Sequence, residues 1–448
     1  MSYADRPWVK HYDAGVPASL EPFPNKTVHA LLEDVAAKFP NNPVSVMSAR
    51  LPVVGRQAAA MTYGQLNGLS DCLAAALADK GVRKGDRVAI NSPNCPQFLI
   101  AFFGILKAGG IVVALNPTYP PAKQAEVLND SGVETVITMS SFYKALDSVR
   151  KETPVRHIIV FNIKEYLPPL ARTLFTLARE KKDGHYIETL SPGDEWLQAL
   201  LARYTPAQRP AIDFDPAMDI ALFQYTGGTT GLPKAAKATH RGLVINSRQI
   251  GAFFTLDVAK TFLAAAPFFH VYGLVAVLIL AVDNAGPMYM VMNPRDTLDV
   301  IEQAHHFRPT VYMGVPALYN AINMNKDVQA GKYDLSSIKA CISGSAPLPP
   351  DTKRRFEDLT GGTVAEGFGM SEIAVASHCN PLKGINKTGS IGMPLPDVDS
   401  RIISLDDGET ELPIGEVGEL VIRTPTMMLG YHNRPTETAN TLRDDWLY

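Results

Sequence analysis

The stretch on which the fold and the chemistry of this chain depend is Phe223-Gln-Tyr-Thr-Gly-Gly-Thr-Thr-Gly-Leu-Pro-Lys234. The apolar run at residues 220–225 predicts a strand that ends where the loop begins. Glycine has no Cβ and tolerates positive φ, so the loop can turn several backbone N–H groups toward one point. The donors that we expect to meet there belong to Thr226, Gly227, Gly228, Thr229, Thr230, Gly231 and Lys234. Amides, hydroxyls and one cation form an anion site, and the expected anion is a polyphosphate.

Two other interpretations of this loop are weaker. A flexible surface loop is a common fate of Gly/Thr-rich sequence, but this loop lies between apolar runs and ends in Pro233-Lys234. A Walker loop needs a lysine directly after its last glycine, whereas Lys234 stands three residues after Gly231 and is followed by Ala235. A P-loop kinase is therefore disfavoured.

The composition is that of an ordinary globular protein, with 448 residues, 46% apolar and 19% charged. This length predicts two or three structural units. A net charge of −3 gives no reason to expect nucleic acid as a partner. Four widely spaced cysteines and no apolar signal sequence predict a reduced, cytoplasmic protein without disulfides or zinc. The uncharged run at 262–282 has the length of a membrane span, but Pro267 and His270 favour a buried strand, a turn and a core helix.

Strands and helices alternate at intervals that are typical of parallel sheets with helical crossovers. Expected strands are residues 85–90, 111–115, 133–138, 157–161, 220–225, 261–265, 287–291, 310–313 and 338–343. Expected helices are residues 31–39, 66–77, 97–107, 241–254 and 297–306. The chain ends in short alternating strands at 398–404 and 418–423. The pattern predicts an α/β protein with two doubly wound α/β subdomains, residues 1–215 and 216–395, plus a small β-barrel-like subdomain, residues 396–448.

An insert at residues 165–182 predicts a short basic amphipathic helix that starts at Pro169. Its apolar stripe and its cations are Leu170, Leu174, Leu177, Arg172, Arg179, Lys181 and Lys182. Such a helix can pack on its own domain, which is the interpretation that we favour slightly, or lie on an anionic membrane surface.

A second glycine-rich turn, Glu366-Gly-Phe-Gly-Met-Ser-Glu372, carries a ring, a hydroxyl and a carboxylate. Phe368 can stack on a base, Ser371 can bond a phosphate oxygen, and Glu372 can hold Mg²⁺ as a hard oxygen ligand. Alone, the pattern fits equally well a turn before a helix with a solvated Glu372. Together with the first loop it favours a nucleotide site.

Three shorter segments add candidates, each with a plainer structural alternative. Gly344-Ser-Ala-Pro347 follows a predicted strand, where small residues let a flat ring approach, although a simple strand-to-helix corner has the same appearance. Pro267-Phe-Phe-His-Val-Tyr-Gly-Leu274 puts His270 in an apolar run, where a lone histidine is usually a core residue. Val315-Pro-Ala-Leu-Tyr319 is apolar enough to be core.

These motifs, in this order, resemble those of the adenylate-forming superfamily, which includes acyl-CoA synthetases, luciferases and the adenylation domains of peptide synthetases. Residues 223–234 match the family's phosphate loop position for position, and residues 366–372 resemble its Y-G-x-T-E motif, with Phe368 and Ser371 as departures. The segments around Arg6-Pro-Trp8, residues 85–117 and the insert look like bacterial-type long-chain fatty acyl-CoA synthetases.

The resemblance implies ATP, CoA and a fatty acid as substrates and Mg²⁺ as the metal. Implied catalytic residues are Thr226, Lys234, His270 and Glu372, and the implied Mg²⁺ ligands are Thr226 and Glu372. Implied nucleotide contacts are residues 226–231, Lys234, Gly344, Ser345, Ala346, Glu366, Gly367, Phe368, Gly369, Met370 and Ser371. Implied acyl-pocket contacts are Phe269, His270, Tyr272, Val315, Pro316, Gly344 and Gly367.

In the family, the sequence continues after Trp446-Leu-Tyr448 with Thr-Gly-Asp, a hinge and a C-terminal domain with part of the CoA site. We therefore expect this chain to bind ATP and fatty acid but to complete the thioester poorly. Two alternatives stay open: an enzyme that adenylates a medium-chain or aryl acid, and a non-catalytic module that binds nucleotide or lipid. Acyl chain length, oligomeric state and peripheral contact with the inner face of the membrane are left open by the sequence.

Overall fold

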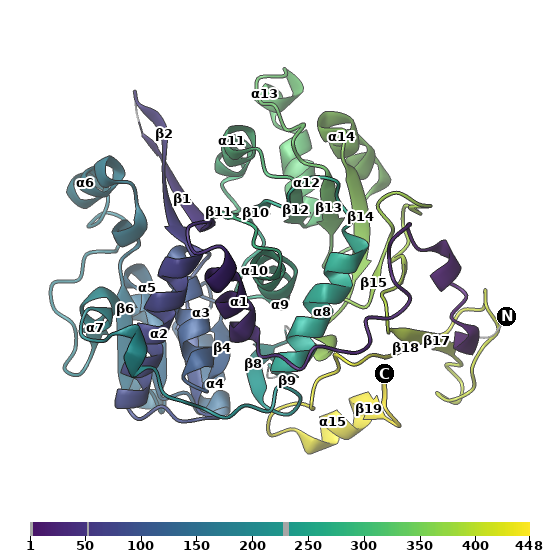
Figure 1. Ribbon diagram of the computed structural model, residues 1–448, viewed down its shortest axis with the longest axis horizontal. Coiled ribbons are helices and arrows are strands. Elements are labelled where there is room, and N and C mark those ends of the chain that lie inside the picture. The colour runs from purple at the N-terminus through teal and green to yellow at the C-terminus, as the bar shows by residue number, and fades with distance from the viewer. Residues whose placement is uncertain (1–2, 52, 227–232) are drawn as a thin grey trace.

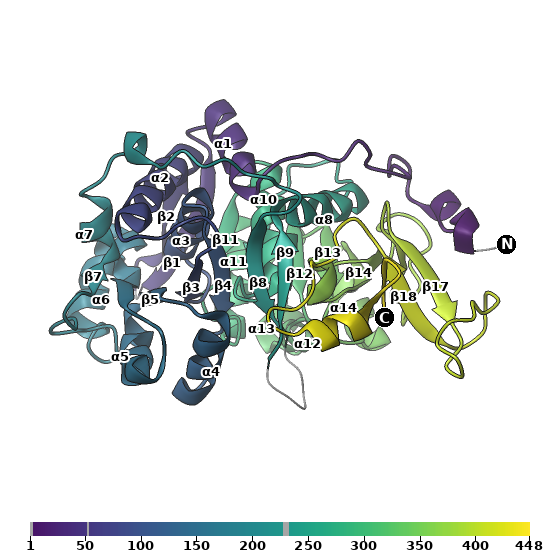
Figure 2. The same ribbon diagram turned by 90° about the horizontal axis from the view of Figure 1, so that it is seen from below.

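The computed structural model describes residues 3–51, 53–226 and 233–448. Its strands form two large mixed sheets and one small sheet, and helices pack against the two large sheets (Figure 1). The two large sheets lie next to each other along the long axis, and the small sheet lies at one end beside the N-terminus (Figure 2). The architecture is the predicted α/β class.

The first sheet has the strand order β7-β6-β5-β3-β4-β8-β9. Its strands are β3 (Arg87–Asn91), β4 (Ile111–Leu115), β5 (Thr135–Met139), β6 (His157–Phe161), β7 (Glu195–Trp196), β8 (Ile220–Tyr225) and β9 (Ala235–Thr239). Pairing is parallel throughout, except that β9 runs antiparallel to β8. The central strands are continuously buried because helices cover both faces.

Two groups of helices cover this sheet. The helices α1 (Val28–Lys38), α2 (Tyr63–Asp79) and α3 (Pro96–Lys107) share one apolar cluster with alternate strand residues such as Val88 and Ile90. The helices α4 (Pro121–Ser131) and α5 (Ser140–Ser148) pack on the opposite face against residues such as Ala89. The two clusters are separate because successive residues of a strand point to opposite faces of the sheet.

The second sheet has the order β16-β15-β14-β13-β12-β10-β11-β1-β2. Its strands are β1 (Pro43–Leu51), β2 (Gly55–Thr62), β10 (Phe262–Ala264), β11 (Met288–Met290), β12 (Val311–Gly314), β13 (Ala340–Ser343), β14 (Thr363–Phe368), β15 (His378–Cys379) and β16 (Met393–Pro394). The central pairs are parallel, and β2, β15 and β16 are antiparallel to their neighbours. One face is covered by α8 (His240–Phe253), α9 (Val271–Gly273), a π-helical turn (Leu274–Ile279) and α10 (Leu280–Asp283). The other is covered by α11 (Thr297–Phe307), α12 (Pro316–Asn323) and α14 (Pro350–Thr360).

The remaining elements are a small sheet and four short helices. A four-stranded antiparallel sheet contains β17 (Asp399–Ile403), β18 (Glu419–Arg423), β20 (Trp446–Leu447) and β19 (Leu442–Arg443), in that order. The short helices are α6 (Pro169–Ala178), α7 (Leu197–Leu201), α13 (Lys326–Gln329) and α15 (Pro435–Thr441). The N-terminal segment reaches the small sheet, where Arg6 Nε lies 2.7 Å from Asp399 Oδ1 (Figure 2).

The division of the chain into three subdomains stays a prediction, but the sheets cross the boundary expected at residue 215. The β1–β2 hairpin comes before it and belongs to the second sheet, because Ser45 pairs with Met288 of β11. The strands β8 and β9 come after it and belong to the first sheet, because Val112 of β4 pairs with Leu222. The chain therefore passes twice between the two sheets.

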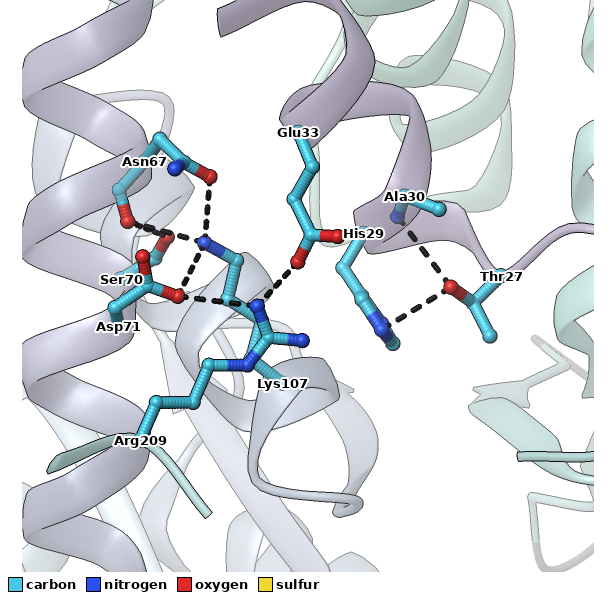
Figure 3. A network of polar contacts seen from close by, with 9 residues as sticks. All are labelled: Thr27, His29, Ala30, Glu33, Asn67, Ser70, Asp71, Lys107 and Arg209. Carbon is cyan, nitrogen blue, oxygen red and sulfur yellow. Dashed lines mark hydrogen bonds and ion pairs between the residues drawn. The ribbon is translucent and has the colours of Figure 1, made fainter. Parts of the chain in front are cut away.

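A buried polar network ties the helices of the first sheet to the segment that leads into β8 (Figure 3). The Lys107 side chain is fully buried, and its Nζ donates to Asn67 Oδ1 at 2.7 Å and to Asp71 Oδ1 at 2.8 Å. Burial lowers the pKa of Lys107. Arg209 lies 3.2 Å from the same Asp71 oxygen and also pairs with Glu33 of α1. Lys107 thus joins α3 to α2, and Arg209 joins α2 to α1.

The predicted strand, turn and helix at residues 262–282 are present as β10, α9, the π-helical turn and α10. Within the described residues, none of the helices combines the length and the apolar character that crossing a membrane requires.

Candidate functional site

A cavity of about 330 Å³ opens where β8 of the first sheet and β13 and β14 of the second sheet end. Parallel strands of open α/β sheets commonly present ligand sites at their carboxyl ends. The predicted site residues that line it are Thr226, His270, Tyr272, Gly344, Ser345, Gly367, Phe368, Gly369, Met370, Ser371 and Glu372. Four segments that are distant in sequence thus meet at one cavity.

The phosphate loop is described only at its two ends. Tyr225 pairs with Ala235 in the β8–β9 ladder, and Thr226 N donates to Lys234 O at 2.9 Å. Thr226 lines the cavity. The predicted contacts of Gly227, Gly228, Thr229, Thr230 and Gly231 lie outside the described residues.

The second glycine-rich turn is too tight for any residue but glycine at position 369. A Cβ on Gly369 would lie 1.6 Å from Val375 O. The close approach folds the chain back after β14, so that Phe368 O accepts from Ser377 N at 3.0 Å. Ala374, within the same turn, has a φ of +70°, a strained conformation for a non-glycine residue. The turn presents Ser371 and Glu372 to the cavity.

Glu366 uses its carboxylate within the protein. It is buried, and its Oε1 accepts from Gly389 N at 2.7 Å while its Oε2 accepts from Leu348 N at 3.4 Å. These bonds hold two loops to the end of β14. A contact of Glu366 with nucleotide stays a prediction.

Lys234 and Glu372 both contact Tyr431, a residue that was not among the predicted site residues. The Lys234 Nζ lies 4.6 Å from the centre of the Tyr431 ring. The Tyr431 hydroxyl donates to Glu372 Oε1 at 2.6 Å. Glu372 lines the cavity, and Lys234 directly precedes β9.

His270 forms the cap of α9 and faces the cavity. Its Nδ1 accepts from Tyr272 N at 3.2 Å, which leaves the ring proton of the neutral form on Nε2. The side chain is open to the cavity, yet the protein around it removes enough water to lower the pKa of His270. The Tyr272 hydroxyl donates to Gly314 O at 3.2 Å and to Ile342 O at 2.9 Å, and so fixes the ends of β12 and β13.

Several predicted residues lie near this cavity without lining it. Within the described part of the chain, the cavity wall does not include Ala346, Val315, Pro316, Glu366, Lys234 or Phe269. Val315 and Pro316 start α12, and Ala346 is exposed beyond Ser345. Phe269 instead lines a second cavity of about 370 Å³, together with Asn94, Phe142 and other residues at the strand ends of both sheets. The roles of these six residues stay predictions.

The apolar part of the cavity wall was missed by the sequence analysis. It includes Ile250, Phe253 and Phe254 from the end of α8, with Cys379 of β15 and Leu395. The apolar spacing along α8 was visible in the sequence, but it equally fits a core helix. His378 also lines the cavity; it is buried between Ser377 and Ser400, and burial lowers its pKa to about 3.

The site offers few protein ligands for a metal ion. The described residues contain no group of three His, Cys, Asp or Glu side chains that could hold one. Glu372 and Thr226 both line the cavity, so one carboxylate and one hydroxyl are available there. This donor set fits Mg²⁺, which proteins usually hold through one or two carboxylates plus the phosphates of a substrate.

Comparison with known proteins agrees with this geometry. The family described as "AMP-binding enzyme" matches residues 32–432. The long-chain-fatty-acid–CoA ligase of Bacillus subtilis is 37% identical over 452 residues, covering 99% of this chain and 77% of the relative. The corresponding ligase of Salmonella typhimurium is 32% identical over 449 residues, covering 98% of this chain and 77% of the relative.

Solved structures share the fold. A long-chain-fatty-acid–CoA ligase from Archaeoglobus fulgidus has a TM-score of 0.81 at 23% identity, covering 98% of this chain and 83% of that one. An anthranilate CoA ligase in complex with anthranoyl-AMP has a TM-score of 0.81 at 22% identity, covering 100% of this chain and 76% of that one. With the family match spanning most of the sequence and its motifs gathered around one cavity, this chain belongs to the AMP-binding enzyme family.

Proposed function

We propose that this protein is a long-chain fatty acid–CoA ligase that forms AMP. The observation that carries the proposal is a single cavity whose wall combines the hydroxyls of Thr226 and Ser371 and the carboxylate of Glu372 with an apolar surface from α8. The names of the bacterial relatives at 30–37% identity support a fatty acid rather than an aryl acid as the substrate.

The reaction begins with a carboxylate oxygen that attacks the α-phosphorus of ATP. A new P–O bond forms, the bond to the β-phosphate oxygen breaks, and pyrophosphate leaves with that electron pair. The thiolate of CoA then attacks the acyl carbonyl carbon, a C–S bond forms, and AMP leaves with the electron pair of the C–O bond that breaks. In the first step, two anions approach to about 3.5 Å, which costs roughly 5 kcal/mol per pair of unit charges at an effective dielectric constant of about 20.

The donors around the cavity offset this repulsion. Lys234 and the loop that starts at Thr226 would bind the β- and γ-phosphates, and Ser371 would donate to the α-phosphate. Mg²⁺, held by Glu372, Thr226 and the phosphates, would neutralise charge on the triphosphate when bound. Phe368 would stack on adenine beside the small residues Gly344 and Ser345.

His270 has the properties of a neutral hydrogen-bond donor near the acid. Because its pKa is lowered and its Nδ1 is occupied by Tyr272 N, the imidazole can donate through Nε2 without becoming an imidazolium ion. A neutral donor can orient a carboxylate without forming an ion pair that would reduce its nucleophilicity. The acyl tail would extend along the α8 side of the cavity, where each buried CH₂ group contributes about 0.8 kcal/mol.

The test of this function separates the two half-reactions. Pyrophosphate release, measured over a series of fatty acids with benzoate as an aryl comparison, should be fastest with long chains. The first half-reaction should yield acyl-AMP, and AMP should appear once CoA is added. Lys234→Ala should reduce release by at least about tenfold. Lys237→Ala, in the same strand β9, is the matched control and should retain the wild-type rate. Production of ADP, preference for benzoate, or equal rates for the two lysine variants would overturn the assignment.

A contact with an anionic membrane is the second part of the proposal. The helix α6 leaves Leu170, Leu174 and Leu177 exposed by 48%, 40% and 80%, while its own domain contacts Ala171 and Phe175. The helix thus packs on its own domain through Ala171 and Phe175, as predicted, whereas the three leucines of its apolar stripe point to solvent. Leucines pointing to solvent beside Arg172, Arg179, Lys181 and Lys182 match a surface with an apolar interior and anionic headgroups.

Val54, in the turn between β1 and β2, is a further exposed apolar residue at 49%. We expect sedimentation with vesicles that contain phosphatidylglycerol but weaker binding to pure phosphatidylcholine. The double variant Leu174→Ser/Leu177→Ser should lose most of this binding. Leu405→Ser, at a leucine that is 72% exposed elsewhere, should retain it. Equal binding by both variants would exclude α6 as the contact.

A further inference from the structure

The chain segment at residues 428–434 runs along β9 and along the turn that carries Glu372. Met428 N donates to Glu372 O at 2.7 Å. Leu429 N donates to Lys237 O at 2.9 Å, and His432 N donates to Ala235 O at 2.8 Å. The segment therefore behaves as an additional short strand that fastens the exit of the phosphate loop to the second glycine-rich turn.

Tyr431 lies at the centre of this segment, and its side chain is held on several sides. The residue is 5% exposed, and its ring packs with Ala236 and Met428. Its backbone N donates to Thr438 Oγ1 at 2.9 Å. With both backbone and ring held, the hydroxyl has one well-defined direction, and in that direction it meets Glu372 Oε1 at 2.6 Å.

The same ring faces the cation of the phosphate loop. Lys234 Nζ lies 4.6 Å from the ring centre, which is within the range of a cation–π interaction. No ion pair joins Lys234 to Glu372 within the described residues. Tyr431 thus contacts both charged groups, Lys234 through the face of its ring and Glu372 through its hydroxyl.

From these contacts we infer that Tyr431 is a positioning residue, which orients Glu372 toward a divalent cation and keeps Lys234 beside the phosphate loop. The inference deepens the proposed function and rests on it for the assignment of the ligand. A phenol that binds one carboxylate oxygen leaves the other oxygen to coordinate a cation and reduces the number of orientations that the carboxylate samples. Partners of this kind typically change metal affinity or activity by about 10- to 100-fold when removed.

Removing only the hydroxyl tests the inference. In Tyr431→Phe the ring and its contact with Lys234 are retained, whereas the bond to Glu372 is lost. Binding of a non-hydrolysable ATP analogue is measured by calorimetry at increasing Mg²⁺ and in the presence of a chelator. The Mg²⁺ concentration for half-maximal binding should rise by about tenfold or more. Binding in the chelator should stay within about twofold of wild type.

Two further variants give the controls. Tyr431→Leu also removes the ring, so it should weaken nucleotide binding in the chelator as well. Tyr143→Phe removes a hydroxyl that donates to a carboxylate, Asp194, at 2.7 Å far from the site, and should leave the Mg²⁺ dependence unchanged.

An unchanged Mg²⁺ dependence in Tyr431→Phe would overturn the positioning role. So would a loss of binding that is the same with and without Mg²⁺, because that result indicates a purely structural tyrosine. Calorimetry requires no fatty acid, so a wild-type chain that binds the Mg²⁺–nucleotide complex but releases no pyrophosphate would reject the proposed function alone.

Discussion

Replacing Gly369 by alanine should disable adenylation while leaving most of the fold in place. The added Cβ would meet Val375 O at 1.6 Å, Val375 C at 2.6 Å and Ala376 Cα at 2.7 Å. All three are backbone atoms, so no side-chain rotation can relieve the overlap. The turn between Phe368 and Ser377 has to open instead.

The size of the movement follows from the overlap. Real Cβ contacts are essentially never shorter than 3.0 Å, so the two backbones must separate by at least 3.0 − 1.6 = 1.4 Å. Ser371 and Glu372 lie inside the turn that has to open, and both line the cavity. A displacement of about 1 Å in groups that align reactants costs roughly 100-fold in rate, and overpacking costs about 1–3 kcal/mol of folding free energy.

Pyrophosphate release with a saturating long-chain acid is the assay, with urea denaturation to follow the free energy of unfolding. Gly68→Ala is the control, because its Cβ would meet only Pro206 Cγ at an ordinary 3.7 Å. That variant should keep wild-type activity and unfold at the same or a slightly higher urea concentration. The reasoning fails if Gly369→Ala retains half of the wild-type rate, or if both glycine variants lose activity to the same extent.

Three other outcomes follow from buried groups. Lys107→Met should lower the free energy of unfolding by roughly 3 kcal/mol, measured in urea, because it leaves Asp71 with Arg209 as its remaining cation. Burial lowers the pKa of His240 to about 4, so below about pH 6.5 the unfolded chain takes up a proton at this residue that the folded chain does not. The contribution of His240 to stability should be constant above this pH and fall by about 3 kcal/mol toward pH 4. His240→Gln should reduce the pH dependence of the free energy of unfolding by that amount. Phe253→Trp should shift pyrophosphate release toward shorter acids, since a larger ring on the cavity wall excludes part of the tail.

Much of the local structure could be predicted because it depends on local sequence. The strands at 111–115, 157–161 and 220–225 have the bounds expected from their continuous apolar runs. The helix α3 begins one residue before the expected position. The second glycine-rich turn also lies where predicted, because Gly369 tolerates a backbone approach that any Cβ would block.

The β1–β2 hairpin, by contrast, could not be predicted from local sequence. Its strands alternate irregularly between buried and exposed residues, so no clear period marked them. Its place at the edge of the second sheet depends on pairing with β11, which lies far along the chain. The exposure of the α6 leucines could likewise not be predicted, because an apolar stripe has the same sequence whether protein or membrane covers it.

By itself, then, the sequence determined which chemical groups are present and how each short segment folds: a loop rich in amides with one lysine, a turn with a carboxylate, and a histidine before a helix. Only the tertiary structure decided which of them meet. Tyr431 contacts Lys234 and Glu372 because the chain after β18 returns to pair with β9, and that pairing depends on the packing of distant segments. Local propensity is encoded residue by residue, whereas the geometry of a site built from three distant segments exists only once those segments have packed.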